Sequence, residues 1–265
     1  MSANTANTTT SRSAHSEISL RTPTESLRIK APNYIRERSA GEIIREGLRI
    51  YKLHCFVIFI VYVPVTVIAK LTTDVLVFSH DQTRIVLAAR ILNWIIAYIA
   101  ALHLTVVISH IYLGYDVKLR MALKRSVSLL GKAFITVLLV LLLFPLYPWL
   151  MFSLQVVMIE GVWGFKALRR SWELGRYYRL RNFFIYVWPF TLYVVVYMAI
   201  NVLFLYLSLA TPSFRWWELL FSIAKDFTLS LIAPVLIIVA VLLYYDMRIR
   251  NEAYDISSLA EDLRI

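Results

Sequence analysis

The residues best suited to chemistry in this chain are a few histidines and carboxylates within or beside long apolar runs. His103 and His110 share one face of an expected helix, because a spacing of seven is close to two turns. Two turns separate the side chains by about 10 Å along the axis, whereas metal sites on helices use closer spacings. We therefore expect a polar seam that faces other helices and includes Asn201. A proton relay is the alternative, because ionisable groups inside a membrane are functional candidates by default.

Glu160 is the most exceptional carboxylate, because it ends an apolar run and precedes a segment, 166–181, with six basic residues. An unpaired carboxylate at the edge of an apolar layer is costly, so it demands a partner. We expect that partner to be Arg169, Arg170 or an arginine of the C-terminal segment. The alternative is a carboxylate that lines a pathway through the membrane.

The end of the last apolar run carries two further charge pairs. Asp246 and Arg250 are four residues apart, as are Arg248 and Glu252, so both pairs can form if the last helix continues through them. We expect this segment to pack against the helix that carries Arg170. The expected role is a structural latch, and binding of a headgroup phosphate by aspartate and arginine together is the alternative.

Motifs of known catalytic chemistry are missing from the sequence. It contains no Gly-rich phosphate loop, G-x-S-x-G elbow, H-E-x-x-H or EF-hand pattern. Seven glycines in 265 residues leave little room for loops that cradle phosphate. Cys55, the only cysteine, permits no internal disulfide and no cysteine-based zinc site. We expect no metal site, no cofactor and no enzymatic activity.

The elements that carry these residues are long apolar runs. The chain is 59% hydrophobic, with a mean hydropathy of +0.65. Several runs approach or exceed the ~20 residues that cross a ~30 Å hydrocarbon core as a helix, and they are apolar on all sides. We expect an all-α, polytopic integral membrane bundle of about six membrane helices. The runs are Phe56–Ile68, Ile91–Ile111, Phe134–Phe144, Phe183–Leu209 and Leu229–Tyr245.

The segment 132–160 decides the topology, because Pro145 and Pro148 interrupt it. It can form one kinked span or a hairpin that returns to the same side. With the N-terminal tail left out, the hairpin places 14 Lys and Arg residues inside and 5 outside, whereas the single span places 7 inside and 12 outside. The positive-inside rule therefore favours a short hairpin with the two prolines at its tip. Its arms can cross fully or form a re-entrant loop.

The net charge of +11 fits this topology better than it fits nucleic-acid binding, because basic residues in membrane proteins set orientation and attract anionic lipid headgroups. Both termini are expected in the cytoplasm. Basic amphipathic segments at 117–129 and 166–181 suit the interface between lipid and water. No nucleic-acid partner is expected.

The chain divides into three parts. Residues 1–38 are rich in Ser and Thr and predict a disordered tail, with a targeting segment as the alternative. Residues 39–250 form the helical membrane domain, and residues 251–265 form a cytoplasmic tail. The domain opens on Ser39 and Glu42, which fit a capping box. The helix that they begin carries Ile43, Leu48 and Tyr51 on one side, which predicts an interfacial amphipathic helix.

Three stretches carry a resemblance to a known family: Glu160-Gly161, the eight residues from Ala167 to Leu174, and the eleven from Leu242 to Glu252. Over about residues 39–263 the chain resembles the bacterial membrane-domain family named after the membrane portion of glycerophosphoryl diester phosphodiesterases. Ala253 stands where such proteins often have glycine. The resemblance implies a six-helix module in the bacterial cytoplasmic membrane, without the family's separate catalytic barrel.

The function expected from these features is that of a membrane scaffold or an accessory subunit. It would act with a membrane-protein partner or a second copy of the chain, through its charged cytoplasmic surface. The alternative is a lipid or small-molecule transporter, because the paired prolines resemble the broken helices that surround transporter sites near mid-membrane.

Overall fold

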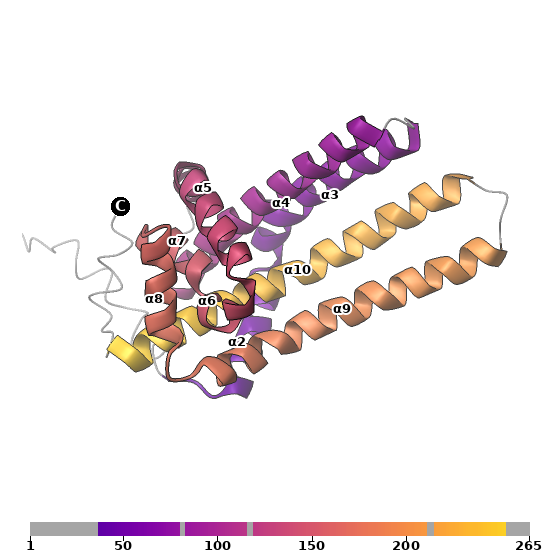
Figure 1. The fold of residues 1–265 in the computed structure, drawn as a ribbon. Helices are drawn as coiled ribbons and strands as arrows, with labels where there is room; N and C mark the ends of the chain where they lie inside the picture. Colours follow the sequence, from indigo (N-terminus) through magenta and orange to yellow (C-terminus); the bar gives the residue numbers. More distant parts are fainter. Residues whose placement is uncertain (1–36, 80–82, 116–118, 211–214, 253–265) are drawn as a thin grey trace, which may run out of the picture.

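A computed structural model of the protein describes residues 37–79, 83–115, 119–210 and 215–252, and the elements within these ranges are helical (Figure 1). Residues 1–36 and 253–265, which make up most of the predicted tails 1–38 and 251–265, lie outside the described residues. The long helices are α3 (Cys55–Ser79), α4 (Thr83–Tyr112), α5 (Leu119–Leu142), α9 (Arg179–Ala210) and α10 (Arg215–Glu252). The shorter ones are α2 (Ala40–Leu53), η1 (Phe144–Leu146), α6 (Tyr147–Leu150), α7 (Ser153–Glu160) and α8 (Phe165–Gly175).

The five long helices are each long and apolar enough to cross a membrane. A sixth candidate is the pair formed by Tyr147–Glu160 and Phe165–Gly175, which is bent by 115°. By helix length and hydropathy the chain is therefore a polytopic integral membrane protein, which confirms the predicted all-α membrane bundle. In Figure 1, α3 runs beside α4 and α9 beside α10, and both pairs extend away from a base formed by α2 and α5 to α8.

Charged residues bound the apolar part of the bundle at two levels. On α10, nineteen residues without a charge separate Asp226 from Asp246. At 1.5 Å per residue they extend about 28 Å, which matches the ~30 Å hydrocarbon core of a bilayer. On α4, Arg90 and His110 are separated by a similar length. We call the level of Asp246 the charged end of the bundle and the level of Asp226 the distal end.

The segment after α4 forms the predicted hairpin, because Arg125 on α5 donates a 2.6 Å hydrogen bond to the carbonyl of Ile159 near the end of α7. Its arms are unequal. The described part of the predicted basic segment 117–129 belongs to α5, which runs without a proline over residues 119–142. The returning arm consists of short pieces, with Pro145 in η1 and Pro148 in the first turn of α6, where a missing N–H is tolerated.

The capping box that opens α2 is confirmed, since the Ser39 hydroxyl accepts from the Glu42 amide while the Glu42 carboxylate accepts from the Ser39 amide. The buried stripe of α2 consists of Ile43, Gly47 and Ile50. Leu48, expected on the buried side, is 38% exposed. Gly47 lies four residues after Ile43 and three before Ile50, so it belongs to the same stripe. Because glycine has no side chain, α2 can approach α10 closely there.

Tyr51 adds a polar tie between α2 and α10. Its hydroxyl donates a 2.8 Å hydrogen bond to the Leu231 carbonyl. Burial, with a smaller contribution from nearby Cys55, raises the pKa of the Tyr51 hydroxyl, so the group stays a donor throughout the physiological pH range.

Gly47 provides a test of the α2–α10 contact. A Cβ atom added there would lie 3.4 Å from Val239 and 3.6 Å from Ile238 and Leu242, which is ordinary contact. We therefore expect Gly47→Ala to leave thermal stability nearly unchanged, whereas Gly47→Leu overpacks the contact and costs about 1–3 kcal/mol. Thermal unfolding in detergent, followed by size-exclusion chromatography, measures both. Equal melting temperatures for the two variants would contradict the contact.

Candidate functional site: an ionic network at the charged end

Asp246 is the centre of a buried group of charges, and its side chain is only 2% exposed. One carboxylate oxygen accepts the backbone N–H of Arg38 at 2.8 Å. The other accepts from Arg181 at 2.9 Å and from Arg250 at 3.0 Å. The predicted pair of Asp246 with Arg250 is confirmed, and α10 continues as a helix through both residues.

The same two arginines also hold the main chain of Arg38. Its carbonyl oxygen accepts from Arg181 at 2.6 Å and from Arg250 at 2.8 Å, while Arg250 forms a further 2.8 Å ion pair with Glu37. The described chain before α2 is thereby fixed to the start of α9 and the end of α10. The sequence predicts a disordered tail up to residue 38, whereas Arg38 is 7% exposed and fully engaged.

Glu160 lies at the end of α7 and has two kinds of partner. Its carboxylate accepts from Arg170 at 3.0 and 3.2 Å and from the Tyr244 hydroxyl at 2.7 Å. Arg248 lies 3.9 Å away. Burial is the largest single influence on Arg170 and opposes its charge, but the carboxylates of Glu160 and Glu252 together raise the pKa of the guanidinium above its ordinary value.

Of the two arginines expected beside Glu160, Arg170 is the partner. Arg169 pairs with Glu173 at 3.0 Å on the exposed side of α8. The reason is helical geometry: neighbouring residues point about 100° apart, so only one of the two can face the interior. The network around Glu160 therefore lacks Arg169.

Glu252 joins the end of α10 to α8. It forms ion pairs with Arg170 of α8 and, at 3.2 Å, with Arg248 one turn earlier on α10. The Asn251 side chain adds a 2.7 Å hydrogen bond to the Leu174 carbonyl. The predicted Arg248–Glu252 pair and the predicted contact between the end of α10 and α8 are both confirmed. Chemically, this arrangement neutralises charge and fixes helix ends rather than leaving a group free to react.

The predicted seam of His103, His110 and Asn201 is distributed over separate environments. His103 is buried on α4. His110 contacts the Val106 carbonyl of its own helix at 2.8 Å and lies edge-on to Tyr115. Asn201 donates to the Tyr197 carbonyl at 2.6 Å, within α9. Within the described ranges, no contact brings the three side chains together, because α9 packs on α10, α6 and α2.

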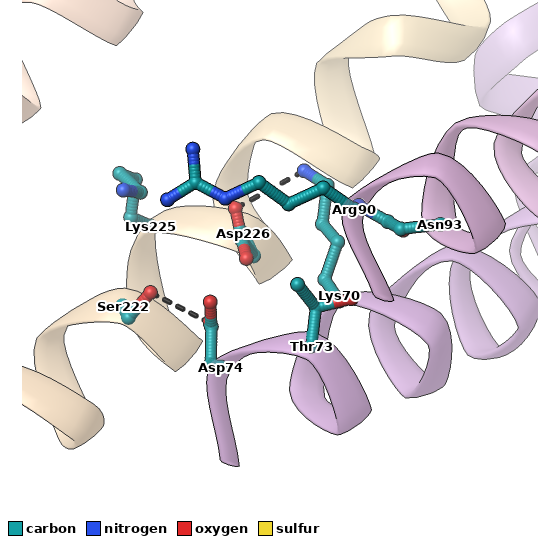
Figure 2. A pocket seen from close by; sticks show the side chains of 8 residues that line it. All are labelled: Lys70, Thr73, Asp74, Arg90, Asn93, Ser222, Lys225 and Asp226. Atoms are coloured by element: carbon teal, nitrogen blue, oxygen red, sulfur yellow. Dashed lines mark hydrogen bonds and ion pairs between the residues drawn. The ribbon is translucent and has the colours of Figure 1, made fainter. Parts of the chain in front are cut away.

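A second polar group lies at the distal end and encloses a cavity of about 220 Å³ (Figure 2). This group was not predicted from the sequence. The sequence does contain an indication of it, because polar residues occur at the same depth in the membrane on three different spans. The lining side chains are Lys70, Thr73 and Asp74 of α3, Arg90 and Asn93 of α4, and Ser222, Lys225 and Asp226 of α10.

The fold and the two polar groups define a class: a polytopic helical membrane protein with an ionic network at one edge of its apolar layer and a polar cavity at the other. Among the described residues, no group of three or more His, Cys, Asp or Glu side chains is placed to hold a metal ion. No family model, curated protein or solved structure matches the chain.

Proposed function

We propose that the protein is a non-catalytic membrane scaffold or accessory subunit of the membrane-domain family that it resembles. The observation that carries this proposal is that, at the charged end, the buried carboxylates are paired while many basic residues remain exposed. The carboxylates of Glu160, Asp246 and Glu252 are all bonded inside the network. An excess of exposed cations is left on α8 and the start of α9.

These exposed residues form what we call the basic aromatic surface. Cations and aromatic rings alternate on it, and cation heads with aromatic bodies suit the lipid headgroup zone, where they also attract anionic lipid. The surface is therefore suited to hold this end of the bundle at a membrane face and to present it to a partner. Its members are Phe165, Lys166, Arg169, Trp172, Arg176, Tyr177 and Arg179, which are all exposed.

The same surface supports an orientation. Basic residues next to membrane spans favour the cytoplasmic side, so the charged end is proposed to face the cytoplasm, together with both termini. The resemblance adds the bacterial cytoplasmic membrane as the location.

The interior of the bundle supports a scaffold over the alternative of a transporter. A transporter site needs a polar cavity near mid-membrane. Between the two charged levels most buried side chains are apolar, such as Val61 of α3, Leu102 of α4 and Val239 of α10. The buried hydroxyls of Thr66, Thr105 and Ser109 donate to carbonyls of their own helices. The distal cavity lies about one hydrocarbon-core thickness from the network, and His103 and Glu160 do not line it.

Single cysteines in a Cys55→Ser background test the orientation. Arg176 lies in the basic aromatic surface and Arg84 is exposed near the distal end of α4. In intact cells we expect Arg84→Cys to react with a membrane-impermeant thiol reagent and Arg176→Cys to be protected until the membrane is opened. Reaction of Arg176→Cys from outside would overturn the orientation.

A photoreactive group attached to the same Arg176→Cys chain then tests the scaffold function. At native expression level we expect one discrete adduct, either with a membrane protein or with a second copy. The matched control is Leu205→Cys, an exposed apolar position on α9, which should give mainly lipid adducts. A monomer without any protein adduct at position 176 would contradict the proposal.

A further inference from the structure

The distal cavity has the charge balance of an anion site. Asp226 is neutralised by Lys70 at 3.1 Å, and Asp74 accepts a 2.7 Å hydrogen bond from Ser222 (Figure 2). Lys225 lies close enough to Asp74 to act on it electrostatically, without an ion pair between them. With three cations and two carboxylates around it, the cavity has an excess of positive charge.

Two polar groups in the cavity lack a protein partner among the described residues. The Arg90 guanidinium, on an exposed part of α4, has no ion pair there and reaches across the cavity towards α10 (Figure 2). The side-chain oxygen Oδ1 of Asn93 is buried without a hydrogen-bond donor. A buried acceptor left unpaired costs free energy, so the cavity is suited to a ligand that offers both negative charge and a donor.

The depth of the cavity in the membrane indicates that lipids of the adjacent leaflet can supply such a ligand. Asp226 lies about one hydrocarbon thickness from the charged end, so the cavity is at the level of the lipid headgroups of the opposite leaflet. Trp94, next to Asn93, is 78% exposed, and tryptophan is enriched at that level of a membrane. Ile91, Leu92 and Ile95 continue from it as exposed apolar side chains, along which acyl chains can lie.

We propose that the distal cavity binds a phosphate-bearing lipid headgroup. Arg90 and Lys225 contact the phosphate, and Asn93 Oδ1 accepts a hydrogen bond from a hydroxyl or an ammonium group of the headgroup. The Lys70–Asp226 pair holds the wall between α3 and α10 in place. Phosphatidylglycerol has the required hydroxyl, whereas phosphatidylcholine has no donor to offer to Asn93.

Native mass spectrometry of the full chain, released from nanodiscs of mixed phosphatidylglycerol and phosphatidylcholine, tests this site. We expect phosphatidylglycerol to be retained in preference to phosphatidylcholine. With about 1 kcal/mol per basic residue, Arg90→Gln combined with Lys225→Gln lowers its retention about 30-fold. The control is Arg120→Gln with Lys124→Gln, which removes two exposed charges from α5 and leaves retention unchanged.

Three outcomes decide the proposal. Equal retention in the cavity variant and the control overturns it. Inorganic phosphate is then added. If it displaces the lipid, and if it raises the melting temperature of wild type but not of the cavity variant, the site recognises phosphate and the free ion is its occupant. If it does not displace the lipid, the lipid is the occupant. If the double variant unfolds, Asn93→Asp replaces the test, because it adds a repelling charge at nearly constant shape. Unchanged retention in Asn93→Asp also overturns the site.

Discussion

Asp246→Ala is expected to destabilise the protein by about 3–5 kcal/mol, because removal of one member of a buried ion pair leaves the other charges without compensation. Arg181 loses its carboxylate partner, Arg250 keeps only the exposed carboxylate of Glu37, and the Arg38 amide loses its acceptor. These partners belong to three separate segments, so the loss frees the start of α2 and the start of α9 together. The melting temperature and the monodisperse fraction in detergent measure the effect.

Glu173→Ala is the matched control for Asp246→Ala. Glu173 also pairs with an arginine one helical turn away, but the two side chains are 52% and 84% exposed. Exposed pairs contribute less than about 1 kcal/mol, so this variant should melt close to wild type. Similar melting temperatures for Asp246→Ala and Glu173→Ala would refute the central place of Asp246.

The adjacent arginines of α8 are expected to behave differently. Arg170→Ala removes the partner of both Glu160 and Glu252, and we expect it to cost about 3 kcal/mol or more. Arg169→Ala removes an exposed pair and should cost less than about 1 kcal/mol. Melting temperatures of the two single variants provide a direct comparison within one turn of helix.

A double-mutant cycle then identifies the partner. Combining Arg170→Ala with Glu160→Ala should give a destabilisation below the sum of the single effects, with a coupling energy of about 1–3 kcal/mol. The pair of Arg169→Ala with Glu160→Ala should be additive. Additivity in the first cycle would mean that the bonds between Glu160 and Arg170 contribute nothing to stability in the membrane protein.

The parts of the fold that depend on nearby residues could be predicted from the sequence. Uninterrupted apolar runs define the spans, and a fixed spacing of four defines the pair of Asp246 with Arg250 and that of Arg248 with Glu252. The hairpin could be predicted because the positive-inside rule compares alternatives over the whole chain. Pro145 and Pro148 supplied its turning point.

The remaining partners of Asp246 could not be predicted, because they come from distant segments. Arg38 is 208 residues away in sequence and Arg181 is 65, and no spacing rule connects such positions. Many arginines lie near helix ends in this chain, so composition alone does not choose among them. The packing of α2, α9 and α10 determines which arginines reach Asp246.

The distal cavity was missed for a different reason. Charges such as Lys70, Arg90 and Lys225 were counted only as outside residues that set orientation. Arg90 lies twenty residues before His110, and Asp226 lies twenty before Asp246. Counting depth along each helix therefore places these polar residues at one level, although only the packing of α3, α4 and α10 makes that level a cavity.

The hydrogen bonds that hold the main chain of Arg38 to Asp246, Arg181 and Arg250 also fix an order of events during synthesis. Arg38 and Asp246 are bonded across 208 positions of the chain, so the segment that leaves the ribosome first is fastened by a helix that leaves it much later. Until α10 has entered the membrane, the Arg181 guanidinium and the Arg38 backbone N–H lack the carboxylate of Asp246 to which they donate. These bonds can therefore form only after α10 has been inserted, and a chain stopped before residue 246 lacks the carboxylate that holds Arg38 and Arg181.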